Sequence, residues 1–286
     1  MIHYAAYRSI GICARDLLYG LAFSLSIFAI FVSASFAEMI HSRAVVVMEP
    51  STGRILYAKD PNRRLPPAST AKLMTAIVAI ERVDLSHTVM IGENASRVHP
   101  LKLGLKKGDK VSVEELLYAA LMKSANDAAV ALSEAVAGSE MQFVDLMNQK
   151  AISIAGRNTK FINSTGLPGP HQFTTALDLS IIMRYALGIP KLKEIMGTTV
   201  AVFSTENGET LFLRNTAELL WYDESFIGGK TGYTWSAGHC FVGAAEREKK
   251  TIIVTLLGNP SRNSLWRETQ DLIAKGYQMM AEKNDL

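Results

Sequence analysis

Cysteine is scarce in this sequence of 286 residues, which contains two. Cys13 lies in an N-terminal segment that we expect to be removed, which leaves Cys240 alone in the mature chain. A disulfide framework within one mature chain is therefore excluded. Because Cys240 precedes the apolar pair Phe241 and Val242, we expect a buried structural thiol rather than a nucleophile.

Other absences exclude whole classes of protein. The sequence has no long run of one charge, no low-complexity tract and no repeat of solenoid length, which argues against a disordered chain or a repeat array. Its net charge of +3 is small and dispersed, so we expect no nucleic-acid partner. No His-Glu-x-x-His motif occurs and the six histidines are scattered. We therefore expect no metal and no cofactor, and structural roles for His171 and His239.

The first 37 residues differ from the rest of the chain. Arg8 and Arg15 precede an apolar run over 17–32, and the segment ends at Ala37 in a small-x-small sequence. This layout predicts a signal peptide over 1–37 that is cleaved after Ala37. An uncleaved membrane anchor is the alternative, although the apolar run is short for a hydrocarbon core of about 30 Å. Residues 38–286 would then form one exported domain, periplasmic or secreted.

Hydrophobic periodicity predicts the order strands, helices, strands, helix. Strands are expected over 44–49, 55–57, 200–203, 210–213, 240–245 and 251–257. Helices are expected over 73–80, 113–122, 127–136, 141–155 and 175–187, with a closing amphipathic helix over 265–281. The simplest assembly is an α/β (α+β) fold, in which early and late strands share one sheet and a helical insertion lies between them.

The first candidate for a reactive group is Ser69, which is followed three residues later by Lys72. A Ser-x-x-Lys pattern is expected about once by chance in a chain of this length, and an N-cap role is the alternative for Ser69. Its position favours chemistry, because it opens the segment 73–80, whose apolar residues on every side predict a buried helix. Residues three apart share a helix face, so Lys72 can reach the Ser69 hydroxyl and act as its base. The pKa of Lys72, about 10.4 in a free lysine, would have to fall, and burial with a second nearby cation would lower it.

A second polar motif is Ser124-Ala125-Asn126, between two expected helices. Side chains in such a turn can project into a cleft. The alternative is an ordinary turn in which Asn126 or Asp127 caps the next helix. No Gly-x-Ser-x-Gly elbow occurs that would favour an α/β-hydrolase site instead.

The third motif, Gly228-Gly229-Lys230-Thr231-Gly232, is the rarest of the three by chance. Its glycines would let a substrate or another backbone approach an edge strand closely. Lys230 offers a cation for a substrate carboxylate, and Thr231 offers a hydroxyl donor. A glycine-rich turn with a surface lysine is the alternative.

The three motifs in this order resemble the signature of class A β-lactamases and penicillin-binding proteins. Their spacing, and the stretches 67–75, 124–129, 163–167 and 229–234, are similar to the low-molecular-mass D-alanyl-D-alanine carboxypeptidases of peptidase family S11. The likeness covers nearly all of residues 38–286. It implies a β-lactamase/transpeptidase-like fold, with an antiparallel sheet flanked by helices and an all-helical subdomain.

The resemblance also implies a role for each matching residue. Ser69 would attack the carbonyl between two D-alanines and form an acyl-enzyme, Lys72 would take the proton, and Ser124 would relay it to the leaving amine. The implied substrate-binding residues are Asn126, Lys230, Thr231, Gly232, Tyr233 and Arg267. The backbone amides of Ser69 and Tyr233 would form the oxyanion hole. The implied partners are peptidoglycan stem peptides ending in D-Ala-D-Ala, and β-lactams as covalent inhibitors.

Two departures from the family pattern and one indirect assignment bear on these expectations. Tyr233 stands where relatives often carry histidine, which leaves its backbone role intact but puts a side-chain role in doubt. The charge assigned to Arg267 depends on an alignment across a loop. In addition, the β-rich domain and amphipathic anchor that follow the catalytic domain in many relatives do not follow the closing helix here, so we expect no C-terminal membrane anchor.

Several activities are compatible with this signature. A carboxypeptidase would remove the terminal D-alanine, and an endopeptidase would cleave D-Ala-meso-diaminopimelate crosslinks. A β-lactamase is disfavoured because no Glu-x-x-Leu-Asn segment lies between the second and third motifs. A catalytically silent sensor of β-lactams or peptidoglycan is disfavoured because all the catalytic side chains are present.

Overall fold

The computed structural model describes residues 40–204 and 210–282 of the chain. The expected signal peptide over 1–37 lies outside the described residues. Among the residues that are described, none of the helices combines the length and the hydropathy that a membrane span requires.

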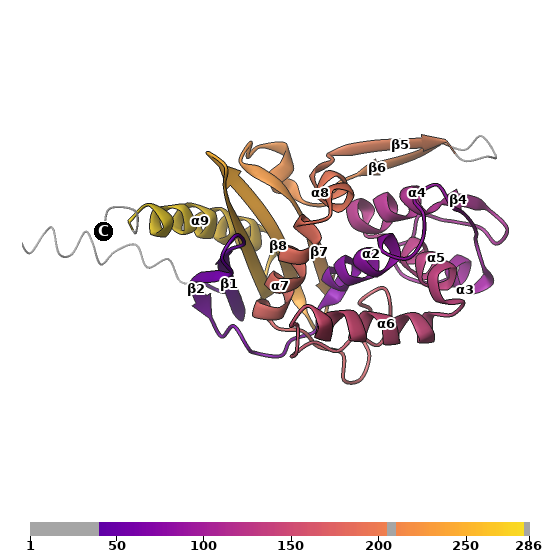
Figure 1. Cartoon of the computed structure of the whole chain (residues 1–286), viewed down its shortest axis with the longest axis horizontal. Coiled ribbons are helices and arrows are strands. Elements are labelled where there is room, and N and C mark those ends of the chain that lie inside the picture. Colours follow the sequence, from indigo (N-terminus) through magenta and orange to yellow (C-terminus); the bar gives the residue numbers. More distant parts are fainter. Residues whose placement is uncertain (1–39, 205–209, 283–286) are drawn as a thin grey trace, which may run out of the picture. The chain divides into compact units, whose positions relative to one another are not determined.

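A five-stranded antiparallel sheet, in the order β2-β1-β9-β8-β7, joins the two ends of the described chain (Figure 1). The strands are β1 Ala44–Glu49, β2 Arg54–Lys59, β7 Phe226–Thr234, β8 Gly238–Arg247 and β9 Lys250–Asn259. Early and late strands therefore share one sheet, as the sequence predicted. The strand β7 lies at one edge, so none of the other strands described here pairs with one side of its backbone.

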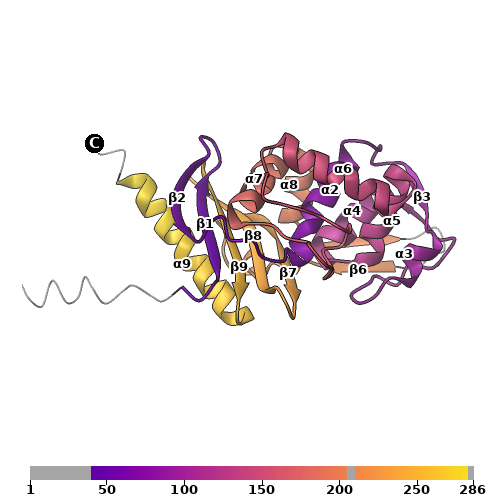
Figure 2. The same cartoon turned by 90° about the horizontal axis from the view of Figure 1, so that it is seen from below.

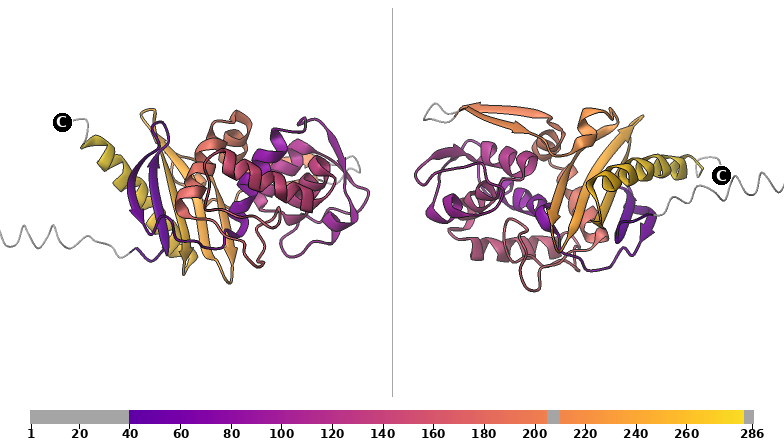
Figure 3. Two further views of the ribbon diagram at one scale, coloured as in Figure 1. Left: turned by 60° about the horizontal axis from the view of Figure 1, so that its bottom comes forward. Right: turned by 180° about the vertical axis from the view of Figure 1, so that it is seen from behind.

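Helices cover both faces of this sheet, as Figure 3 shows. The closing helix α9 (Arg262–Ala281) packs on β8 and β9, while α7 (Ala176–Leu187) and α8 (Pro190–Gly197) pack on the opposite face. Because both faces are covered, β8 and β9 are buried along most of their length and are rich in apolar residues.

The remaining helices form a second region beyond β7, seen on the right of Figure 2. They are α2 Lys72–Ile80, α3 Glu93–Arg97, α4 Val113–Tyr118, α5 Asn126–Ala137 and α6 Glu140–Ser153. The short strands β3 Thr88–Met90 and β4 Lys110–Ser112 pair beside them. This region is the all-helical part that the resemblance implied, with one small hairpin added.

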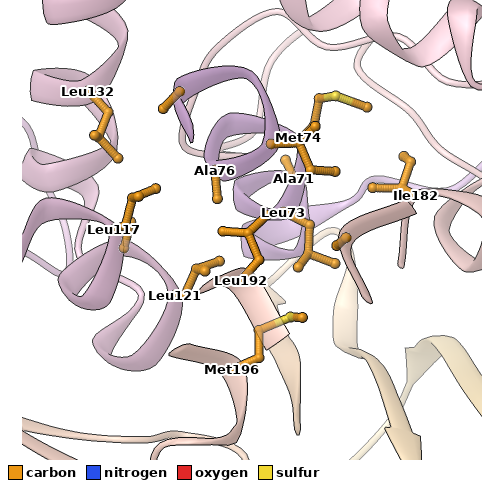
Figure 4. Close-up of a cluster of buried hydrophobic side chains, with 14 of the residues drawn as sticks. Ala71, Leu73, Met74, Ala76, Leu117, Leu121, Leu132, Ile182, Leu192 and Met196 are labelled. Carbon is orange, nitrogen blue, oxygen red and sulfur yellow. The ribbon is translucent and has the colours of Figure 1, made fainter. Parts of the chain in front are cut away.

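Helix α2 lies in the middle of the core, as its apolar sequence predicted. Its residues 72–79 are all buried. Figure 4 shows Leu73 and Met74 among side chains from α7 and α8 as well as from the helical region. Burial of each such side chain contributes about 1.5–3 kcal/mol relative to exposure. This packing holds the N-terminal end of α2, where Ser69 and Lys72 lie, at the junction between sheet and helices.

Two expectations from the sequence were wrong in part. The helix expected over 113–122 ends as α4 at Tyr118 and continues as a π-helical turn, η2 (Ala119–Lys123), an irregularity that is frequent at functional sites. The strands β5 (Val200–Ser204) and β6 (Thr210–Arg214) exist, but within the described chain they pair with each other and not with the main sheet. Val202 and Phe212 on this hairpin are 57% and 59% exposed, unlike the buried residues of β8 and β9 in the main sheet.

Candidate active site

The backbone around Ser69 forms a tight turn that leads directly into α2. Residues Ala68–Ala71 form a 3₁₀ turn, η1, and α2 starts at Lys72. Ala68 has a φ of 48°, in the left-handed region that non-glycine residues rarely adopt. The serine follows a strained residue at the start of a helix, where the positive end of the helix dipole favours a developing negative charge.

The side chain of Lys72 is fully buried and faces Ser69. Its Nζ lies 3.1 Å from Ser69 Oγ, and it also donates to Asn126 Oδ1 at 2.6 Å and to the Thr165 carbonyl at 2.7 Å. Burial holds the pKa of Lys72 well below its usual value and the charge of Lys230 lowers it further, although Asp127 acts in the opposite direction. Burial and the charge of Lys230 thus favour the neutral amine, which is the state that a proton acceptor requires.

Ser124 lies opposite this pair, in the turn between η2 and α5 that the sequence predicted. It ends η2 in a left-handed conformation, with φ 64° and ψ 29°. Lys230, which is fully buried in β7, donates from Nζ to Ser124 Oγ at 3.0 Å and to the Thr231 carbonyl at 2.9 Å. Burial lowers the pKa of Lys230 to about 7. The Ser124 turn and strand β7, whose contacting residues are 106 positions apart in the sequence, thus meet at the Ser124 hydroxyl.

The edge strand β7 passes close to the backbone of Ser69 because residue 232 is a glycine. A Cβ atom on Gly232 would lie 2.9 Å from the Ser69 nitrogen and 3.1 Å from the nitrogen of Thr70. Only a glycine permits this approach, which sets the next residue, Tyr233, beside the nucleophile. The backbone amides of Ser69 and Tyr233 are therefore carried on two segments in contact.

Ser69 and Ser124 lie in the wall of a cavity of about 280 Å³. Its walls include Ser69, Ser124, Thr231, Gly232 and Tyr233, while Thr231 Oγ1 lies 2.7 Å from Thr216 Oγ1 at one side. Within the described part of the chain, no group of three His, Cys, Asp or Glu side chains is arranged to hold a metal ion. The two serine hydroxyls of the wall, with the buried amines of Lys72 and Lys230 in contact behind them, form the set needed for acyl transfer through a covalent intermediate.

A family model described as D-alanyl-D-alanine carboxypeptidase matches residues 31–261. The chain belongs to the D-alanyl-D-alanine carboxypeptidase family. The family assignment covers η1, β7 and every residue of the cavity up to the start of α9.

Several curated relatives in this family resemble most of the chain. The D-alanyl-D-alanine carboxypeptidase DacB2 of Mycobacterium tuberculosis is 35% identical over 242 residues, which cover 82% of this chain and 81% of that relative. A D-alanyl-D-alanine endopeptidase of Escherichia coli is 31% identical, over 80% of this chain and 78% of the relative. The carboxypeptidase DacF of Bacillus subtilis is 32% identical, but the chain spans 59% of its length.

Solved structures confirm the transpeptidase-like fold that the resemblance implied. A crystal structure of a D-alanyl-D-alanine carboxypeptidase from Mycobacterium tuberculosis matches with a TM-score of 0.79 at 31% identity, over 83% of this chain and 91% of the other. A variant of the Streptomyces K15 DD-transpeptidase matches with a TM-score of 0.80 at 28% identity, over 84% and 99%.

Arg267 does not line the cavity beside Ser69. Arg267 is exposed on α9, whereas Arg262, five residues earlier, lines the cavity and forms an ion pair with Glu218 at 2.7 Å. The two positions are about 1.4 turns of helix apart and so lie on different faces, and the sequence contains no signal that says which arginine faces the cleft.

Two other residues of the cavity wall were expected to be structural. The ring of His239 lies 4.5 Å from that of Tyr233, and burial together with the charge of Arg262 lowers its pKa. Cys240 is buried and unpaired, and burial raises the pKa of its thiol to about 11. The prediction of a buried structural thiol is confirmed.

Three contributors to the site were not identified from the sequence. The carbonyl of Thr165 accepts a hydrogen bond from Lys72, and the buried carboxylate of Asp127 accepts backbone N–H groups of the loop 103–105. Leu101, in the same loop, lines the cavity. A backbone carbonyl has no sequence signal of its own. The neighbouring Gly166 was the one available indication, because it lies in the stretch 163–167 that resembles the family.

Proposed function

We propose that this protein is a serine D-alanyl-D-alanine carboxypeptidase that removes the terminal D-alanine from peptidoglycan stem peptides. One observation carries the proposal. The amine of Lys72 lies 3.1 Å from the Ser69 hydroxyl, in a buried position that favours its neutral form. A serine hydroxyl is a weak nucleophile, and a neutral amine at this distance is the base that would activate it.

In the first step, Ser69 Oγ attacks the carbonyl carbon between the two D-alanines while Lys72 accepts its proton. The oxyanion that forms would accept hydrogen bonds from the backbone amides of Ser69 and Tyr233. One such donor typically contributes a factor of about 10² to 10³ in rate. Asn126 would orient the amine, since its Oδ1 accepts a hydrogen bond from Lys72 at 2.6 Å.

In the second step, the carbon–nitrogen bond breaks and the leaving D-alanine takes a proton from the Ser124 hydroxyl. Ser124 in turn takes back the proton that Lys72 had accepted from Ser69, so both side chains return to their starting states. Lys230 supports this transfer through its hydrogen bond to Ser124 and attracts the terminal carboxylate, which the Thr231 hydroxyl would also bind. We assign the assisting guanidinium to Arg262 instead of Arg267, because Arg262 lines the cavity. Water then hydrolyses the acyl-enzyme and releases the shortened peptide.

The test is Ser69→Ala, with Ser153→Ala as control because Ser153 is exposed on α6, away from the cavity. We expect the wild type and the control to release D-alanine from a pentapeptide and to be labelled by fluorescent penicillin. We expect the Ser69 variant to lose more than about 10³-fold in release and to lose all labelling. Unchanged release by the Ser69 variant would refute the proposal.

An endopeptidase activity is the second candidate, favoured by the relative from Escherichia coli that is named as a D-alanyl-D-alanine endopeptidase. Incubation with defined monomeric and crosslinked muropeptides, read by mass, separates the two activities. Loss of one D-alanine from the monomer indicates a carboxypeptidase, and conversion of dimers to monomers indicates an endopeptidase. Rapid turnover of a chromogenic cephalosporin would instead indicate a β-lactamase, which the missing Glu-x-x-Leu-Asn segment disfavours.

We further propose that the chain is exported through the signal peptide over 1–37 and acts in the periplasm or outside the cell. The layout of charges, apolar run and small residues supports this proposal. N-terminal sequencing of the protein from its cells should begin at Glu38, and a retained Met1 would contradict cleavage.

A further inference from the structure

A second cavity lies at the opposite end of β7 from the catalytic residues. It has a volume of about 450 Å³, and among the described residues it shares none with the cavity beside Ser69. Its wall includes Ile227 at the start of β7, whereas Gly232 lies about 17 Å further along the strand, at about 3.3 Å per residue. A volume of this size is typical of sites that bind small ligands. The protein therefore has a second candidate ligand site that is remote from the acyl-transfer chemistry.

The wall of this second cavity, which we call the basic cavity, is rich in positive charge. Its cationic side chains are Arg184, Lys193, Lys249 and Lys250. The carboxylate in the wall is that of Glu49, which already forms an ion pair with Arg54 at 3.3 Å. Lys193 forms a long ion pair with Glu246, at 3.7 Å, but within the described part of the chain no carboxylate pairs with the other three cations. The uncompensated positive charge favours an anionic ligand.

The guanidinium of Arg184 is held in a fixed position against the β1–β2 turn. Its Nη2 donates to the Ser51 carbonyl at 3.2 Å, and a Cβ atom on Gly53 would lie 2.8 Å from its Nη1. Lys249 stands in the β8–β9 turn beside Glu248, an exposed residue that is not part of the wall. A fixed guanidinium offers a fork of N–H donors that matches a phosphate group, and lysines add mobile point charges. The set of donors in the basic cavity therefore suits a phosphate.

An apolar cavity adjoins the basic cavity. Its volume is about 580 Å³, and Arg184 and Gly188 belong to the walls of both. The other residues of its wall are mostly apolar and come from α7 and from the adjoining ends of α6 and α8: Ser153, Ile154, Ile181, Tyr185 and Ile189. Each of them is at least partly exposed. Apolar surface that is open to solvent beside a cationic wall matches a ligand with an anionic head and an apolar tail.

We propose that the two cavities bind an anionic phospholipid, with its phosphate in the basic cavity and the first methylenes of its acyl chains in the apolar cavity. Charge complementarity and burial of apolar surface both contribute to binding of such a ligand. A lipid held there leaves the catalytic cavity open, because the described walls of the basic cavity and of the cavity beside Ser69 have no residue in common. This inference goes beyond the proposed peptidase activity and does not depend on it.

The first test compares three soluble probes by isothermal titration calorimetry. They are dihexanoyl phosphatidylglycerol below its micelle concentration, dihexanoyl phosphatidylcholine and glycerol phosphate. We expect phosphatidylglycerol to bind at least about tenfold more tightly than the other two, since burial of two methylenes alone contributes about tenfold and the choline cation opposes the basic wall. Added salt should weaken the binding. Equal affinity for glycerol phosphate would overturn the assignment of the apolar cavity, and equal affinity for phosphatidylcholine would overturn that of the basic cavity.

The second test removes the cations. Arg184→Gln and the double variant Lys249→Gln/Lys250→Gln should each weaken the binding of dihexanoyl phosphatidylglycerol about tenfold. Lys102→Gln/Lys160→Gln is the matched control, because it removes two exposed lysines outside the described walls of both cavities, and it should bind as the wild type does. All the proteins share one N-terminus, so the segment before residue 40 contributes equally to each. Unchanged circular dichroism reports a folded protein.

Three results would overturn the lipid site. They are a wild type that binds none of the probes, an equal loss of affinity in the control and in the cavity variants, and full binding by the variants that lack the cations. Release of D-alanine should be the same in all these proteins, so a failure of the peptidase activity in the wild type would count against the proposed function alone.

Discussion

Two buried lysines govern the chemistry at the scale of single residues. Lys72 and Lys230 are both fully buried, and the charge of Lys230 lowers the pKa of Lys72. The oxygens that Lys72 contacts belong to a hydroxyl, an amide and a backbone carbonyl, none of which carries a charge. Neutral acceptors satisfy the amine without strongly favouring its protonated form, so the site keeps a base available.

We expect kcat/KM to pass through a maximum with pH, with an ascending limb set by Lys72 and a descending limb set by Lys230. Activity should rise with pH as Lys72 loses its proton, and fall as Lys230 loses its proton near its pKa of about 7. Lys230→Arg should move the descending limb to higher pH, because a guanidinium stays charged, while lowering the maximum about 10- to 100-fold. The measurement is kcat/KM against pH with a D-Ala-D-Ala peptide. Lys123→Arg, at an exposed lysine of the cavity wall, should leave both limbs in place. A descending limb that does not move in Lys230→Arg would exclude Lys230 as its source.

At the scale of elements, the site depends on close backbone contacts between η1 and its neighbours. Gly232 brings β7 against η1 from one side. Gly166 does the same from the loop whose residue Thr165 accepts the Lys72 hydrogen bond. A Cβ atom on Gly166 would lie 1.8 Å from the Ala68 carbonyl oxygen, which is a direct overlap.

Gly166→Ala should therefore both destabilise the protein and slow acylation. The overlap and the φ of +80° at this position predict a free energy of unfolding lower by about 1–3 kcal/mol. Displacement of the Thr165 carbonyl should slow labelling by penicillin, because Lys72 loses a positioning contact. The measurements are urea unfolding and the rate of acylation. Gly108→Ala is the matched control, since Gly108 has a φ of +90° but no atom within 4 Å of the added Cβ. Equal effects in both variants would show that backbone strain alone, not the contact with η1, is responsible.

At the scale of the whole molecule, a buried carboxylate joins the two ends of the described chain. Glu268 in α9 accepts hydrogen bonds from Ser42 Oγ at 2.6 Å and from the backbone nitrogen of His41 at 2.7 Å. Burial alone would raise the pKa of Glu268, but the hydrogen bonds from Ser42 and His41 lower it overall. The contact holds the segment before β1 against the closing helix α9.

Glu268→Gln should lower the free energy of unfolding by about 1–3 kcal/mol at pH 7. Since the pKa of Glu268 is lowered in the folded state, its stabilisation is present above the ordinary carboxyl pKa of about 4.3 and is lost as the pH falls through the lowered value. The difference between wild type and variant should therefore shrink in urea unfolding repeated toward pH 3. Glu224→Gln, at an exposed carboxylate before β7, should change stability by less than about 0.5 kcal/mol. A difference that stays constant with pH would contradict the assignment.

The sequence by itself determined whatever depends on neighbours along the chain. The face that Ser69 and Lys72 share follows from their spacing of three residues, because a helical turn brings such residues together wherever the helix lies. The buried nature of α2 and the order of strands and helices followed from the apolar pattern in the same way. The motifs at Ser124 and Lys230 could be found one by one, but their meeting could only be expected from their resemblance to a family.

The tertiary structure alone decided contacts between segments far apart. In the structure, Arg262 and not Arg267 lines the cavity, and β5 and β6 form a separate two-stranded sheet. The Thr165 carbonyl accepts a hydrogen bond from Lys72. Each of these depends on how whole elements pack, and a rotation of α9 by a fraction of a turn would exchange the two arginines. Every residue has a carbonyl of the same chemistry, so only packing determines which one meets a buried amine.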